Sequence, residues 1–205
     1  MKIRIGVGAA GAASSPDALA ELVTGLDDLG FDSLWLSEVL TGPVIDPVVG
    51  LAWAAASNPR LKVGTTMLLP GRNVIRLAKQ LASLDVLCRG RLLVTLVPGL
   101  TYPPERDAIG VEPKRRGAVI DETLPLLRRL WAGETVSHEG AAGTFRDVKL
   151  SPLPMQQPLE VWLGGPAPAA LERCARLSDG WLPSQCTPEE AAAGRVVIEE
   201  VAAKA

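Results

Sequence analysis

The stretch 61–99 constrains the fold more than any other part of this 205-residue chain. It holds two apolar runs, 61–69 and 91–97, separated by the Pro70-Gly71 turn and a helical pattern. One face of that pattern carries Val74, Leu77, Ala78, Leu81, Leu84 and Cys88. Apolar strands joined by an amphipathic helix indicate a parallel βαβ unit whose strands are covered on both faces. Such a sheet places its ligand site at the carboxyl ends of the strands.

The same alternation of strand and helix patterns extends along the chain. The predicted strands are 3–8, 33–37, 61–69, 91–97, 160–163 and 180–183, and helices are predicted from Pro16, Pro47, Asn73, Lys114, Pro168 and Pro188. Residues 101–113 are expected to form a polar lid or binding loop, and Pro125 is expected to bend or restart the helix 114–131. Residues 134–158 are expected to form a hairpin excursion. The pattern therefore predicts six βα units in an α/β fold, with the strands parallel and in sequential order.

Composition indicates one globular domain that acts on a small molecule. Hydrophobic residues make up 47% of the chain, enough for a sizeable core. The formal net charge is −2, with 21 basic and 23 acidic residues interspersed, so no basic patch for nucleic acid or an anionic membrane is expected. Three cysteines without C-x-x-C spacing favour a reducing cytoplasm over disulfides or a metal site. No stretch is apolar over the ~18 residues that a membrane-spanning helix requires.

The first glycines offer a different interpretation. Gly6-Val7-Gly8-Ala9-Ala10-Gly11 matches G-x-G-x-x-G, and Glu38 closes the second predicted strand, as in a nicotinamide dinucleotide-binding Rossmann domain. In that motif the helix begins within the glycines. Here Ser15 and Pro16 are typical of an N-cap and first helical residue, which places the helix after the motif. The Rossmann interpretation is therefore the weaker alternative.

Four segments of the sequence resemble one family, in order and over most of the chain. They are LGFDSLWLSE (29–38), DPVVGLAWAAASNPRLKVGT (46–65), RNVIRLAKQLASLDVLCRGRL (72–92) and VWLGGPAPAALERCARLSDGWLPS (161–184). These segments look like the luciferase-like monooxygenase family, whose (β/α)8 barrels use flavin mononucleotide (FMN) or the deazaflavin coenzyme F-420. The resemblance implies a TIM-type (β/α)8 barrel and a flavin- or deazaflavin-dependent oxidoreductase, with F-420 slightly favoured. Family habit and the Ala-rich helix 48–57 also lead us to expect a homodimer.

A closed barrel of this type needs eight strands, whereas the sequence offers six βα units. We therefore expect residues 1–205 to form a single, incomplete barrel domain, truncated at its carboxyl end. A non-catalytic flavin-binding or partner subunit is the alternative to an enzyme. Val39 follows Glu38 where relatives often carry a histidine, which favours that alternative.

The resemblance assigns the cofactor's ring to the ends of three strands. Glu38 closes the second strand, and Thr65, Thr66 and Met67 close the third, where the family commonly has a non-prolyl cis peptide, here Thr66-Met67. Val97, Pro98 and Gly99 end the fourth strand and are expected on the other side of the ring.

The cofactor's phosphate is expected at Gly164, Gly165 and Pro166, just before the helix 168–177. Glycines that precede a helix expose backbone amides at its positive end, which suits a phosphate. No catalytic residue is assigned and no metal site is expected. The only histidine, His138, is expected at the surface, and most of the five tryptophans are expected in the core.

Overall fold

The computed structural model describes residues 3–9 and 14–204. Its centre is a six-stranded sheet in the order β1-β2-β3-β4-β7-β8, and every neighbouring pair is parallel. These strands are β1 (Gly6–Gly8), β2 (Ser33–Ser37), β3 (Lys62–Leu68), β4 (Leu92–Val97), β7 (Val161–Gly164) and β8 (Gly180–Leu182). The predicted strands, their parallel pairing and their sequential order are confirmed, although β1 is only three residues long.

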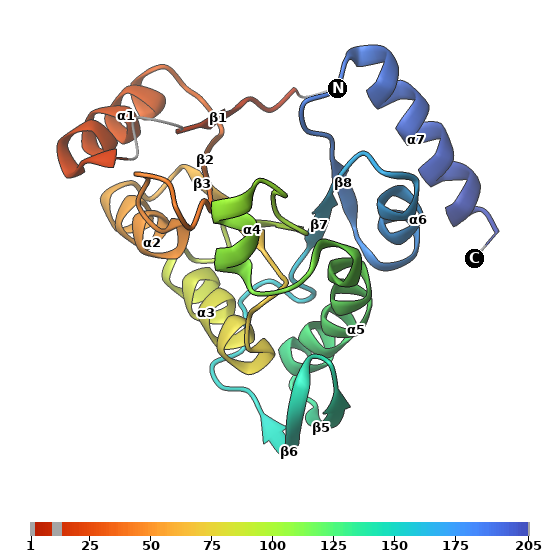
Figure 1. Cartoon of the computed structure of the whole chain (residues 1–205). Helices are drawn as coiled ribbons and strands as arrows, with labels where there is room; N and C mark the ends of the chain where they lie inside the picture. Colours follow the sequence, from red (N-terminus) through yellow and green to blue (C-terminus); the bar gives the residue numbers. More distant parts are fainter. Residues whose placement is uncertain (1–2, 10–13, 205) are drawn as a thin grey trace.

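Helices surround the outer face of this sheet (Figure 1). They are α1 (Pro16–Asp28), α2 (Pro47–Ser57), α3 (Val74–Leu87), α5 (Pro113–Trp131), α6 (Pro168–Leu177) and α7 (Pro188–Ala202). The short helix α4 (Pro103–Ile109) lies in the middle of Figure 1. The antiparallel pair β5 (Thr135–Gly140) and β6 (Gly143–Lys149) stands apart from the sheet, at the bottom of Figure 1. Since β1 and β8 do not pair with each other, the sheet is an incomplete (β/α) barrel with two open edges.

Local capping signals explain where the helices begin. Ser15, Asp46 and Asn73 accept backbone N–H groups of the first turns of α1, α2 and α3, at 2.9–3.2 Å. At α7, Thr187 and Glu190 form a reciprocal capping box. These short-range bonds satisfy amides that a helix leaves free, so the starts are fixed by sequence within a few residues.

The strand order overturns the Rossmann interpretation. In a dinucleotide-binding sheet the first strand lies inside the sheet and the strand order reverses beside it, giving 3-2-1-4-5-6. Here β1 is an edge strand and the order never reverses. Ala10 and Gly11, the end of the glycine motif, lie outside the described residues.

Several local expectations were wrong. The segment 101–113, expected to be a polar lid or binding loop, contains the helix α4. Helix α5 continues past Pro125, so the expected restart there does not occur.

The tryptophans and the histidine also differ from expectation. Only Trp131 is fully buried, whereas Trp53 and Trp162 are 42% and 38% exposed. His138 is not freely solvated: its Nε2 lies 2.6 Å from Oε1 of Glu122, and its side chain is 18% exposed. Glu122 also accepts the amides of Ala141 and Ala142, which fastens the β5–β6 turn to α5.

The inner face of the sheet carries tryptophans over glycines. Successive side chains of a strand point to opposite faces, so Trp35 lies on the face opposite the helices. A Cβ added at Gly64 would lie 2.3 Å from the Trp35 ring, and one at Gly180 would lie 2.7 Å from the Trp162 ring. Only glycine therefore lets these rings lie close to the sheet. Both rings line a hollow of about 250 Å³ at the amino ends of the strands.

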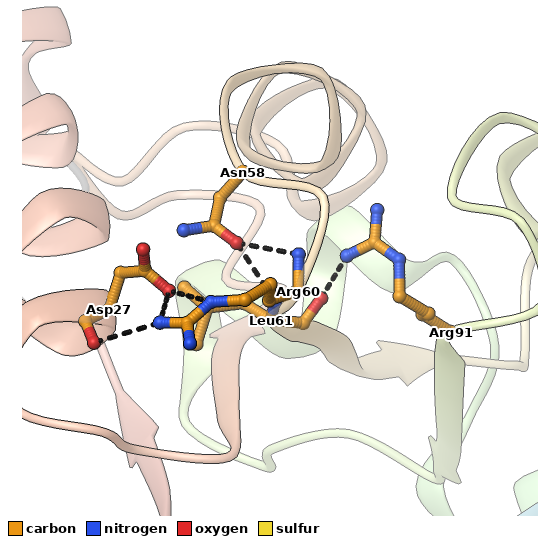
Figure 2. Close-up of polar contacts among 5 residues, drawn as sticks. All are labelled: Asp27, Asn58, Arg60, Leu61 and Arg91. Atoms are coloured by element: carbon orange, nitrogen blue, oxygen red, sulfur yellow. Dashed lines mark hydrogen bonds and ion pairs between the residues drawn. The ribbon is translucent and has the colours of Figure 1, made fainter.

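A network of side chains ties the amino ends of β3 and β4 to the helices (Figure 2). Oδ1 of Asn58 accepts the amides of Arg60 and Leu61 at 2.8 and 2.9 Å. Arg60 donates to Asp27 at the end of α1, and Arg91 at the start of β4 donates to the Leu61 carbonyl. Hydrogen bonds from the Asn58 amide and Arg60 lower the pKa of Asp27 below its ordinary value. The turn before β3 is thereby held from two sides.

Removing the centre of this network should destabilise the fold. Asn58 is 6% exposed, so Asn58→Ala leaves two poorly hydrated amides without an acceptor. We expect the free energy of unfolding to fall by about 1–3 kcal/mol, as measured by urea denaturation. Ser57→Ala, which removes an exposed hydroxyl bonded to its own helix, is the control and should change it by less than about 0.5 kcal/mol. Equal effects of the two substitutions would contradict this role.

Candidate functional site

The carboxyl ends of the parallel strands meet at one end of the sheet, here called the mouth. Glu38 follows β2, Val97 ends β4 and Gly164 ends β7. Leu68 ends β3 and pairs in register with Val97. The structure thus brings the predicted residues of four strands to the same end. Whether they bind a cofactor stays a prediction.

Glu38 and Arg72 form a largely buried ion pair at the mouth. The Glu38 side chain is 4% exposed and that of Arg72 is 22% exposed. Glu38 also accepts the Leu68 amide at 2.8 Å, and Arg72 donates to the Leu68 carbonyl at 2.8 Å. Burial raises the pKa of Glu38, although Arg72 and the Leu68 amide favour its charged form. Glu38 therefore braces the end of β3.

The predicted cis peptide at Thr66-Met67 is wrong. Among the described residues, the cis peptide bonds are Ser151-Pro152 and Gln157-Pro158, so the Thr66-Met67 bond is trans. Thr66 continues regular β pairing with Ser37 and Thr95, so the backbone has no bulge there.

Only one of the three residues predicted at the end of β3 can face a ligand inside the barrel. Thr65 and Met67 are fully buried, and alternation along β3 turns them toward the helices. Thr66 lies between them, is half-buried and faces inward with Gly64.

Helix α4 lies over the ends of β3 and β4 (Figure 1). A Cβ added at Gly71, after β3, would lie 2.3 Å from the Ile109 carbonyl, and one at Gly99, after β4, would lie 2.6 Å from Ile109 Cδ1. Both glycines have positive φ, at 84° and 86°. Gly99 and Pro98 therefore pass beneath the end of α4, which leaves Val97 as the predicted ring contact nearest the inner face.

A buried arginine holds this segment together. Arg116 of α5 is 2% exposed and donates to the carbonyls of Pro98, Leu100 and Val111 at 2.7–3.1 Å. Among the residues that the structure describes, no carboxylate forms an ion pair with Arg116. Burial lowers its pKa, as does the charge of Arg106. Carbonyl dipoles thus replace water around the cation, and the chain from β4 to α5 is fixed in one shape.

A buried glutamate links this segment to the loop after β2. Glu105 is 1% exposed and accepts the amides of Leu40 and Thr41 and the Thr41 hydroxyl at 2.8–3.1 Å. Burial alone would raise the pKa of Glu105, but the bonds from Leu40 and Thr41 bring it below its ordinary value. The mouth loops of β2 and β4 therefore form one connected wall.

The predicted phosphate region lies between β7 and α6. Gly165 has a φ of 120°, and its carbonyl accepts Trp181 Nε1 at 3.1 Å. Pro166 and Pro168 carry no N–H, so Ala167 and Ala169 supply amides at the start of α6. The geometry suits an anion, but with fewer donors than an ordinary helix start has.

Gly164 gives the inner face between β4 and β7 a position without a side chain. At Gly164 a Cβ would lie 2.8 Å from Val97 Cγ1, so only glycine fits there. Nearby, the Thr95 hydroxyl is buried without a hydrogen-bond partner. An orphaned hydroxyl and a glycine cradle at the mouth are compatible with a bound ring system, and we take the residues to fit a flavin-type group.

Sequence reasoning missed Glu105 and Arg116. The run Pro103-Pro104-Glu105 was a signal, because prolines followed by an acidic residue are typical of a first helical turn. The sequence carries no comparable signal for the residues that Glu105 and Arg116 contact.

Other chemistries find no support in the part of the chain that the structure describes. That part holds no group of three His, Cys, Asp or Glu side chains able to bind a metal. Burial raises the pKa of the Cys174 thiol to about 11, far from that of a nucleophile. None of its helices is both long and apolar enough to cross a membrane.

Comparison with known proteins decides the family. The sequence profile of the luciferase-like monooxygenase family matches residues 1–205. The chain belongs to this family. The resemblance read from the four sequence segments is thereby confirmed.

Individual members of the luciferase-like family also match this chain. An F-420-dependent glucose-6-phosphate dehydrogenase of Kineococcus radiotolerans is 27% identical over 191 residues, which are 88% of this chain and 56% of that protein. This chain thus spans a little over half the length of that relative.

Solved structures share the architecture. The monooxygenase RslO1 from Streptomyces bottropensis superposes with a TM-score of 0.85 at 27% identity, covering 98% of this chain and 66% of that one. The oxygenating constituent of 3,6-diketocamphane monooxygenase from Pseudomonas putida, solved with FMN, gives 0.85 at 18% identity, covering 100% and 63%. The latter similarity shows the fold alone.

Removing the cation of the ion pair at the mouth should lower the free energy of unfolding by an amount that depends on pH. Arg72→Met leaves the buried Glu38 carboxylate uncompensated. We expect the free energy of unfolding at pH 7.5 to fall by about 2–3 kcal/mol, less than for a fully buried pair because Arg72 is 22% exposed. A raised pKa means that the folded state holds the proton more readily than the unfolded state, so the loss should shrink at pH 5.

Denaturant unfolding at both pH values measures this loss. Glu38→Gln/Arg72→Met is the control and should be less destabilised than the single substitution at pH 7.5. A loss that is identical at the two pH values would exclude the buried charge as its cause.

Proposed function

We propose that this chain is the cofactor-binding part of an oxidoreductase that acts on a small organic molecule. The observation that carries the proposal is the convergence of Glu38, Thr66, Val97 and Gly164 at one mouth in a chain of the luciferase-like family. FMN and coenzyme F-420 are the candidate cofactors, since the diketocamphane monooxygenase structure holds FMN and the Kineococcus relative is named for F-420. The 27% identity with the F-420-dependent relative, over 88% of this chain, slightly favours F-420.

The residues of the mouth have separate roles in this proposal. Thr66, Val97 and Gly164 would contact the ring, and the amides of Gly165, Ala167 and Ala169 would receive the phosphate. Glu38 and Arg72 keep the end of β3 in place beneath it. The bound cofactor would supply the electron transfer, whereas the protein orients the ring and excludes water.

A non-catalytic flavin-binding subunit is the second candidate. Val39 follows Glu38 and Leu100 is half-exposed at the mouth, so neither position offers a proton donor or acceptor. Turnover of a substrate with bound cofactor would exclude this candidate, whereas binding without turnover would favour it. We expect either protein in the cytoplasm.

We also propose a homodimer through α2. Val49 and Trp53 lie one turn apart on its outer face and are 64% and 42% exposed. The small residues Ala52 and Ala56 flank them, and small residues let two helices approach closely.

Sedimentation at micromolar concentration tests the dimer. The wild type should sediment as a dimer and Trp53→Arg as a monomer, because the arginine would be buried unpaired in the interface. Met155→Arg, at a 58% exposed position away from α2, is the control and should stay dimeric. A monomeric wild type would sink the proposal.

A charge placed at the start of α6 should weaken cofactor binding without harming the fold. Ala167 is the exposed N-cap of α6, with an extended backbone, and aspartate is a favoured N-cap residue. Ala167→Asp should therefore keep or raise stability, yet lower the affinity for FMN or F-420 at least about tenfold, or roughly 1.4 kcal/mol, because its carboxylate repels the phosphate.

Titration by visible absorbance and tryptophan fluorescence measures the affinity. Ala167→Asn, which caps the helix without charge, is the control and should bind more tightly than Ala167→Asp. NADH is the negative ligand. A wild type that binds neither FMN nor F-420 would overturn the proposed function.

A further inference from the structure

An apolar cavity of about 290 Å³ lies beside the mouth and has no part in the cofactor site described above. It lies between the end of β1, the end of β2 and the loop that leads to α2. The residues that shape it include Gly8, Ala9, Ser37, Val39, Val44 and Ile45. None of the described residues that line it is charged.

The cavity is open because β1 ends in a glycine. A Cβ added at Gly8 would meet no atom within 4 Å, in contrast to Gly6 and Gly64, where it would collide with Trp35. Gly8 pairs in register with Trp35, and both residues line the cavity. The space above Gly8 is therefore available to a ligand.

Charge next to the cavity acts against anions. The loop residues Val39, Val44 and Ile45 also line a neighbouring cavity, whose lining includes Glu38 and Asp46. Arg72 pairs with Glu38, whereas Asp46 accepts the amides of Val48 and Val49 and forms no ion pair with a described residue. An anionic ligand would thus lose its water beside a carboxylate without gaining a cation.

One side-chain polar group faces this space. The Ser37 residue is exposed, and no protein group accepts from or donates to its hydroxyl among the hydrogen bonds of the described residues. A hydroxyl can donate to a carbonyl or accept from an alcohol. Small-molecule sites are mostly apolar with a few polar groups that fix orientation, which is the pattern here.

We propose that this cavity is the substrate side of the mouth and that it takes an uncharged, compact apolar molecule with one carbonyl or hydroxyl group. The apolar body packs against Val39, Val44 and Ile45, and the oxygen bonds to the Ser37 hydroxyl. This inference rests on the proposed function only where it calls the ligand a substrate. Binding to the cavity does not depend on that function, because the protein alone forms the cavity. It excludes sugar phosphates and carboxylic acids as good substrates.

The test compares two rigid ligands of similar shape, adamantanone and adamantane carboxylate, by ligand-observed saturation-transfer NMR without cofactor. The wild type should bind the ketone at least about tenfold more tightly than the carboxylate. Gly8→Ile should weaken ketone binding at least about tenfold, because it fills the cavity at a strand position that accepts a side chain without a clash. Val44→Asp should do the same by adding a charge.

Val196→Asp is the control for the charge, since Val196 of α7 is 52% exposed and lies outside the cavity, and it should leave ketone affinity unchanged. Circular dichroism of each variant confirms that it is folded. Equal binding of both ligands, or full ketone affinity in folded Gly8→Ile and Val44→Asp, would overturn the proposal.

A parallel titration with FMN and F-420 separates this inference from the proposed function. A wild type that binds a cofactor but not the ketone refutes the apolar cavity and leaves the proposed function standing. Conversely, ketone binding that is lost in Gly8→Ile, in a protein that binds neither cofactor, supports the cavity and refutes the proposed function.

Discussion

Parallel pairing of six strands in sequential order is the constraint on which the rest of the structure depends. After each strand the chain must cross back to the end of the sheet where that strand began, because the next strand runs in the same direction. A helix or a longer segment therefore separates every pair. The carboxyl ends of all six strands then lie together at the mouth, and loops that are distant in sequence become neighbours. Glu38 and Arg72, 34 residues apart, meet only for this reason.

The inner face shows what an incomplete barrel requires of its side chains. In a closed barrel, layers of side chains from facing strands fill the interior. Here Trp35 and Trp162 lie against Gly64 and Gly180, so large rings cover a sheet that no further strand faces. Trp162 remains 38% exposed because nothing described packs on its other side. The open edges at β1 and β8 follow from the same geometry.

Two buried charged side chains make the mouth rigid, and their hydrogen-bond partners are mostly backbone groups. Arg116 is surrounded by carbonyls of its own segment, and Glu105 by amides and a hydroxyl of the loop after β2. Neither forms an ion pair with a buried partner, so each depends on several backbone dipoles held at fixed positions. These bonds join the loop after β2 to the segment between β4 and α5 at the mouth.

The sequence by itself determined the elements whose causes are local. Caps at Ser15, Asp46, Asn73 and Thr187 set helix starts, and apolar runs set the strands, because these signals act over a few residues. Together with the family resemblance they predicted the parallel order and the mouth. They did not predict that the Thr66-Met67 bond is trans, that a helix forms at 103–109 or that Trp162 is 38% exposed.

Only the tertiary structure decided those points, and it also decided which residues of the mouth face a ligand. Thr65 and Met67 turn away from the interior while Thr66 faces it, a choice set by the register of β3 between its neighbours. Glu105 finds Leu40 and Thr41 across more than 60 residues, and nothing in the local sequence encodes such a partner. Packing of separate segments, and not the preference of any one of them, fixes these contacts.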